Sequence, residues 1–67
     1  MNAIRTDCEG SQVGLSKDEL LILYAALNEI CNGIDVHEFE TRIGATTEQA
    51  LKLMGEVGQL LDSMATL

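Results

Sequence analysis

The chain is poor in the residues that build most functional sites. Its 67 residues include no proline, no tryptophan, one histidine and two cysteines. Two cysteines, Cys8 and Cys31, do not make a disulfide framework. His37 has no second histidine or cysteine at the spacing of a metal site. We therefore predict no disulfide scaffold, no metal and no cofactor.

Long apolar runs are also missing. The longest, Leu20 to Leu27, has eight residues, whereas a membrane-spanning helix needs about 20. Near the N-terminus, Asp7 and Glu9 stand where a signal peptide would be apolar. We therefore expect a cytoplasmic protein without a membrane partner.

Positive charge is scarce, with four Lys and Arg residues against eleven Asp and Glu residues and a formal net charge of −7. Such a surface increases solubility, repels nucleic acid and attracts basic proteins. A chain of this length buries only about 60% of its unfolded surface, and small domains usually add disulfides, a metal or a partner. Because disulfides and a metal are not predicted, we expect this small domain to be stabilised by oligomerisation.

Three capping boxes mark helix starts, at Ser16–Glu19, Asp35–Glu38 and Thr46–Gln49. Gly33 and Gly44 follow the first two helices as left-handed terminators. The sequence therefore predicts an all-α fold of three helices with a long third helix. The expected ranges are 16–32, 35–43 and 46–66, in a single domain over residues 15–67 that follows a flexible polar leader over residues 1–14.

The apolar face of the third predicted helix is unusually wide. It spans about 200°, from Leu51 round to Leu60 and Leu67, and a helix buried on one side needs about half of that arc. We predict a homodimer packed through this helix and the outer face of the first. The expected interface residues are Leu21, Ile22, Leu53, Val57, Gly58, Leu60, Leu61 and Met64.

The stretch from Phe39 to Ala50, with Gly44 and Thr46 between two helices, resembles the turn of a helix-turn-helix domain. The resemblance implies a recognition helix that begins near Thr46 and presents side chains to DNA bases. Among the positions it would expose, Lys52 is the only basic one, and Glu48 would be repelled by phosphate. In size and charge the chain also resembles small acidic bacterial immunity-type proteins, although no motif carries that likeness.

No catalytic residues are predicted. His37 could form an acid–base pair with Glu38 or Glu40, but this exposed helix start offers neither a pocket nor a nucleophile. We expect a small acidic interaction protein that binds and neutralises a basic partner, as an immunity or antitoxin-type inhibitor of a nuclease toxin. The predicted partner-binding residues are Glu29, Asp35, Glu38 and Glu40, with His37 and Arg42 at the rim.

Two alternatives belong to other classes of function. The first is a dimeric DNA-binding or transcription-associated regulator, favoured by the turn around Gly44. The second is a structural helical subunit of a larger assembly, favoured by the wide apolar arc.

Overall fold

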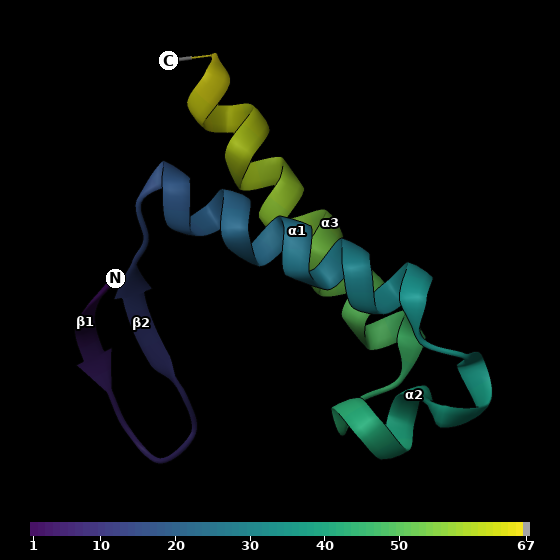
Figure 1. Cartoon of the computed structure of the whole chain (residues 1–67). Helices are drawn as coiled ribbons and strands as arrows, with labels where there is room; N and C mark the ends of the chain where they lie inside the picture. Colours follow the sequence, from purple (N-terminus) through teal and green to yellow (C-terminus); the bar gives the residue numbers. More distant parts are fainter. Residues whose placement is uncertain (67) are drawn as a thin grey trace.

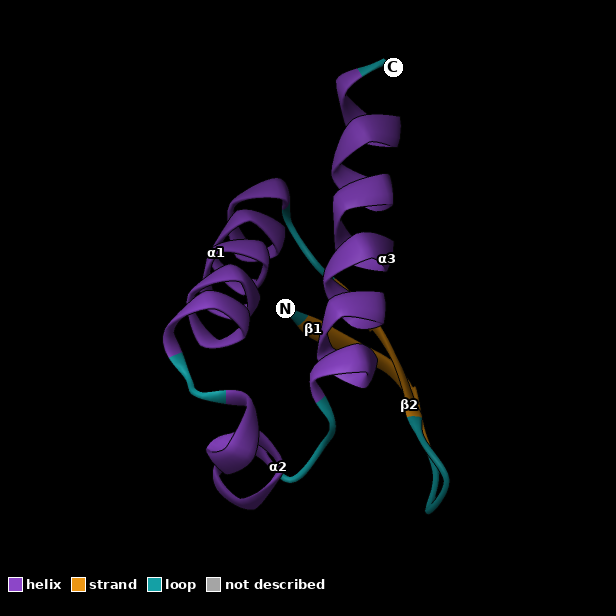
Figure 2. Ribbon diagram, turned by 90° about the vertical axis from the view of Figure 1, so that its right-hand side faces the viewer, coloured by secondary structure: helices purple, strands orange, loops and turns teal. Residues whose placement is uncertain are grey.

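The computed structural model describes residues 1–66 and contains a β-hairpin and three helices (Figure 1). Helices α1 and α3 pack along each other, and α2 lies at one end of the pair (Figure 2). The hairpin stands to one side, at the start of α1. The strands are β1 (Asn2–Thr6) and β2 (Ser11–Gly14), and the helices are α1 (Lys17–Gly33), α2 (Val36–Ile43) and α3 (Thr47–Ala65).

The hairpin shows that the predicted all-α class is wrong, because the fold is a mostly helical mixture of helices and an antiparallel sheet. Strand β1 pairs with β2, with Ala3 opposite Val13 and a bulge at Ile4. The Asp7 carboxylate holds the turn by accepting hydrogen bonds from the N–H groups of Glu9 (2.8 Å) and Gly10 (3.1 Å). Almost every residue of the two strands is exposed. A strand that buries neither face needs no alternation of apolar and polar residues, and these strands therefore lack the pattern by which a half-buried strand is predicted. The boundary between leader and domain stays a prediction.

The prediction of three helices in this order is confirmed. Ser16 and Thr46 form complete capping boxes, the first with Glu19 and the second with Gln49. Asp35 also caps its helix, by accepting a hydrogen bond from the N–H of His37 (2.9 Å), whereas Glu38 instead lies 3.9 Å from Arg42.

The two helix-ending glycines differ. Gly44 has φ of 83°, so it is the left-handed residue expected after α2. The same prediction for Gly33 is wrong. Gly33 is the last helical residue, and the chain leaves α1 through Ile34 in extended backbone with φ of −109°.

The buried core is small. Leu20 from α1 and Ala50 and Val57 from α3 lie in it, together with Phe39, which is only 1% exposed. The helices α1 and α3 pack tightly at Gly58, where a Cβ atom would lie 3.1 Å from Cε2 of Tyr24. Phe39 is the side chain through which α2 enters the core.

The molecule is open and flat. Its radius of gyration is 13.5 Å, compared with about 11 Å for a compact chain of this length. Its accessible surface of 5373 Å² exceeds by roughly 1,200 Å² the surface of a compact monomer of the same mass. The smallest of its three dimensions is 15 Å, so the fold is little more than one layer of helices.

Large apolar side chains of the helices form part of this surface, and the wide apolar arc of α3 is largely uncovered. Within residues 1–66, no helix is both long and apolar enough to cross a bilayer. Leu67, which the sequence analysis placed on the apolar arc, lies outside the described residues. The exposed large apolar residues of the helices are Leu21, Ile22, Leu23, Tyr24, Val36, Ile43, Leu51, Leu53, Leu60 and Met64.

Replacing Phe39 with alanine is expected to destabilise the fold severely. Removing a buried phenylalanine costs about 3–5 kcal/mol, which matches the whole stability that a domain of this size commonly has. Thermal unfolding followed by circular dichroism would measure the loss. The matched control is Val36→Ala on the same helix, where the side chain is 74% exposed, and its melting curve should stay close to that of the wild type. An unchanged melting curve for Phe39→Ala would refute the role of Phe39 as the anchor of α2.

Candidate functional site

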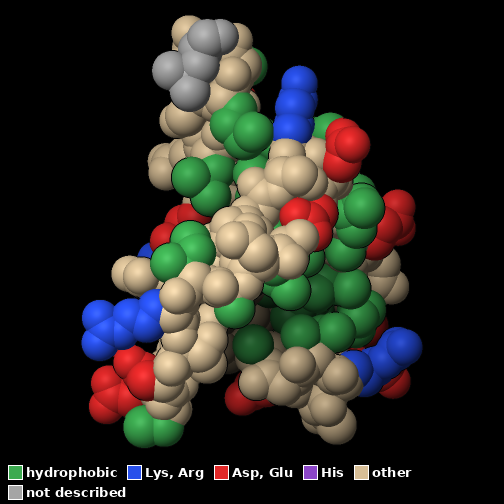
Figure 3. All heavy atoms as spheres, turned by 90° about the vertical axis from the view of Figure 1, so that its left-hand side faces the viewer, with side chains coloured by type: hydrophobic (Ala, Val, Ile, Leu, Met, Phe, Trp, Pro, Cys, Tyr) green, Lys and Arg blue, Asp and Glu red, His purple; other side chains and the backbone are tan. Residues whose placement is uncertain are grey.

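An apolar groove of about 440 Å³ runs between α1 and α3. Its α1 wall consists of side chains three or four residues apart, which therefore share one face of the helix. Among the described residues that line it, Glu56 is the only charged one. The view from the hairpin side shows a patch of hydrophobic side chains next to the hairpin (Figure 3). The lining residues are Leu15, Leu20, Leu23, Ala26, Leu27, Ile30, Leu53, Glu56, Val57 and Leu60.

The groove continues onto the start of α1, beside the hairpin. A second hollow there is lined by Met1, Glu19 and Ile22, and it shares Leu15 and Leu23 with the groove. The Met1 ammonium forms an ion pair with the Glu19 carboxylate. The hydrogen bond from this ammonium lowers the pKa of Glu19 below its usual 4.5, with a further contribution from the Ser16 N–H. The residue that precedes β1 is thereby attached to α1.

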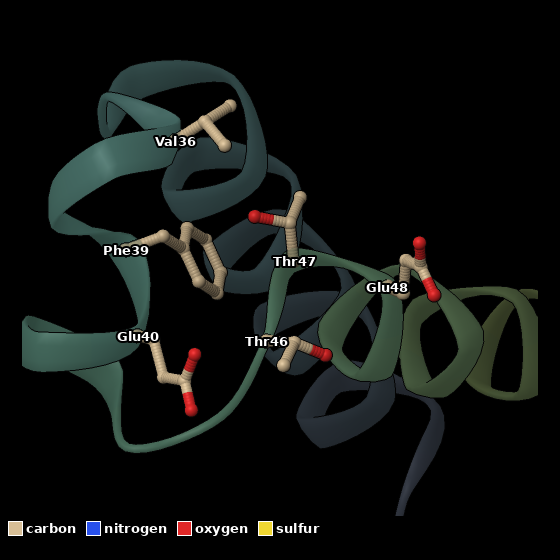
Figure 4. Close-up of a pocket in the computed structure, with 6 residues that line it drawn as sticks. All are labelled: Val36, Phe39, Glu40, Thr46, Thr47 and Glu48. Atoms are coloured by element: carbon tan, nitrogen blue, oxygen red, sulfur yellow. The ribbon is translucent and has the colours of Figure 1, made fainter.

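The opposite end of the molecule is acidic. A hollow of about 320 Å³ lies between α2 and the first turn of α3. Glu40 from α2 and Glu48 from α3 stand at its edges, with Phe39 between the two helices (Figure 4). Thr46, also in the lining, is committed to its cap because its hydroxyl accepts a hydrogen bond from the Gln49 N–H (3.1 Å).

The predicted partner-binding residues are all exposed. Five of them, Asp35, His37, Glu38, Glu40 and Arg42, gather because α2 and its cap are short. Glu29 lies on α1, which in residues 1–66 packs on α3 and not on α2, so no packing contact joins it to the α2 acids. Glu48 was missed as a site residue. Its position in the first turn of α3, which follows α2 after only three residues, was the signal that could have found it.

The predicted dimer residues differ in how far they are buried within one chain. Val57 is buried and Gly58 faces Tyr24, so these two serve the packing of α1 on α3 within one chain, while Leu61 is half-buried. The other members remain exposed: Leu21, Ile22, Leu53, Leu60 and Met64.

Across residues 1–66, no three His, Cys, Asp or Glu side chains are grouped so that they could hold a metal ion. No protein-family model, curated protein or solved structure matches this chain. The interpretation of function therefore rests on the groove and the acidic end.

The ion pair between Met1 and Glu19 is expected to respond to acid. Because the pKa of Glu19 is lowered in the folded protein, the carboxylate contributes stability above its ordinary pKa. That contribution disappears as the pH falls through the lowered pKa. NMR titration should place the Glu19 pKa below 4.5 and show Met1 leaving the hollow that it lines with Ile22 and Leu23 over the same interval.

Two variants test this attachment. Glu19→Gln should weaken the Met1 contacts at neutral pH, because an amide cannot form the ion pair. Glu29→Gln, an exposed position on the same helix, is the control and should leave them unchanged. A Glu19 that titrates at its ordinary pKa would show that the amino terminus is not held by this carboxylate.

Proposed function

We propose that this chain is a small acidic interaction protein that binds and neutralises a basic protein partner, in the manner of an immunity or antitoxin protein that blocks a nuclease toxin. The observation that carries the proposal is the acidic end of the molecule, where Glu40 and Glu48 flank a hollow between α2 and α3. Asp35 and Glu38 add further negative charge on the same short helix and its cap, outside the lining of the hollow. Arg42 is the one basic side chain on α2.

The physical reason is electrostatic complementarity. A nuclease active site is positive because it binds phosphate, and an acidic domain can occupy it in place of nucleic acid. The hollow has room for the end of a lysine or arginine side chain, and the two glutamates would meet its charge. Because these carboxylates are exposed, the association is expected to weaken as salt is added.

The helix-turn-helix alternative has one observation in its favour. Helix α2 ends at Ile43, Gly44 turns the chain in left-handed backbone, and α3 begins at Thr47. This is the order that a recognition helix requires. Its first turn, however, exposes Glu48 where a DNA-binding helix would meet phosphate, so we place this function second.

A charge-reversal variant tests the proposal. Immobilised wild-type protein is expected to capture a basic nuclease from a lysate of the source cell at low salt, release it at high salt, and inhibit its cleavage of nucleic acid when added in solution. The variant Glu38→Lys/Glu40→Lys/Glu48→Lys should bind that nuclease at least about tenfold more weakly, a change of about 1.4 kcal/mol.

The matched control carries the same change in net charge at exposed positions away from α2: Glu9→Lys/Asp18→Lys/Asp62→Lys. It should retain most of the affinity. Equal losses in both variants would show that only the overall charge matters and that the acidic end is not the site. Retardation of DNA by the wild-type chain in a gel-shift experiment would favour the DNA-binding alternative instead.

A further inference from the structure

The hairpin lacks support within its own chain. An isolated two-stranded hairpin is marginally stable at best, and it becomes stable through further strands or by packing on a helix. Here, in residues 1–66, neither strand packs on a helix, and β1 is exposed along its whole length. The apolar side chains of Ile4 and Val13 are exposed with it. Something outside the chain must cover this hairpin if it is to be stable.

The groove between α1 and α3 lacks a cover. Leu53 and Leu60 in its lining are 52% and 54% exposed, although they face other apolar side chains across it. The hairpin does not fill this space, because it leaves the start of α1 in a different direction (Figure 1). Its base is held there by the pair of Met1 with Glu19 and by a link of two residues, Leu15 and Ser16.

The uncovered hairpin and the open groove match in length and charge. Strand β1 has five residues, which is about 16 Å of extended chain. The α1 wall of the groove runs from Leu20 to Ile30, which is about 15 Å of helix. The charge in the lining is that of Glu56, and β1 carries the complementary Arg5.

The excess surface matches what a stable dimer buries. Each chain exposes roughly 1,200 Å² more than a compact monomer, and two chains together therefore have roughly 2,400 Å² to bury. Obligate homodimers bury about 2,000–5,000 Å². A twofold arrangement closes on itself and provides each groove with one hairpin.

We propose that two copies of this chain exchange their hairpins, so that β1 and β2 of each copy lie in the α1–α3 groove of the other, with Arg5 beside Glu56. The occupant of the groove is thus a second copy. The acidic end at α2 takes no part in this contact, so the dimer is independent of the proposed binding of a basic partner.

Full-length variants separate this arrangement from other dimers. The hairpin variant is Ile4→Lys/Val13→Lys, with Glu9→Lys in the turn between the strands as its control. The groove variant is Leu53→Lys/Leu60→Lys, with Asp62→Lys on the opposite face of α3 as its control. Each control changes the net charge by the same two units as its variant. All six positions are exposed, and circular dichroism would verify that the helix content is retained.

Sedimentation velocity is expected to show dimers for the wild type and both controls and monomers for the hairpin and groove variants. An equimolar mixture of the two monomeric variants should regain a weaker dimer, because one intact hairpin can still enter one intact groove. A monomeric wild type would overturn the proposal. A dimeric hairpin variant would also overturn it, since helices would then pack face to face. A dimeric groove variant would do so as well, since hairpins would then pair with each other.

A charge exchange tests the same contact without altering apolar residues, should the lysine variants fail to fold. Arg5→Glu and Glu56→Arg should each weaken the dimer by about tenfold, since each places like charges together. The double variant Arg5→Glu/Glu56→Arg should restore most of the affinity. Failure of the double variant to recover would overturn the proposed placement of the hairpin in the groove.

Discussion

The close packing of α1 on α3 at Gly58 is the contact on which the rest of the structure depends. No side chain larger than hydrogen fits there without displacing Tyr24, because a Cβ atom would lie 3.1 Å from its ring. A glycine inside a helix costs about 1 kcal/mol relative to alanine, and Leu20 and Val57 from the same two helices are buried in the core. Helix α2 is then attached at the end of the pair through Phe39. The open groove between α1 and α3 and the acidic end at α2 both follow from this arrangement.

Two packed helices form a single layer, and a single layer cannot bury apolar side chains on both of its faces. Helix α1 is apolar over the eight residues from Leu20 to Leu27, yet only Leu20 among them is buried. The short helix α2 covers one end of the layer and leaves the groove open. The apolar content of the chain therefore exceeds what its own fold buries.

The elements that the sequence predicted are those stabilised by local interactions. The caps at Ser16, Asp35 and Thr46 place each helix start at the residue that follows, because a cap bonds to N–H groups two or three residues away. The hairpin was missed because its turn depends on one carboxylate, that of Asp7, and its strands bury no apolar face. A hydrophobic pattern cannot reveal a strand of that kind.

The surfaces were predictable to a similar extent. The acids of α2 and its cap are neighbours in sequence, so their gathering follows from the short helix alone. The part played by Glu48 depends on how α3 meets α2, which is a tertiary contact. Helical periodicity showed that the arc of α3 is wide, but it does not say which neighbour takes which part. Val57 and Gly58 take part in the packing of α3 on α1 within the chain, whereas the side chains of Leu53 and Leu60 are exposed.

Apolar and charged contacts are segregated along this molecule, and the separation has a physical consequence. Pairing two copies doubles the formal net charge of −7, so long-range repulsion opposes the dimer and the apolar groove must overcome it. Salt screens that repulsion and also screens attraction to a basic partner. Added salt therefore strengthens an association made through the groove and weakens one made through the acidic end. The two pairs of Arg5 with Glu56 in the dimer would reduce the first effect only slightly, since they are two exposed contacts against a whole surface of like charge. The two associations can thus be distinguished by the sign of their salt dependence, because one arises from burial of apolar surface and the other from exposed charge.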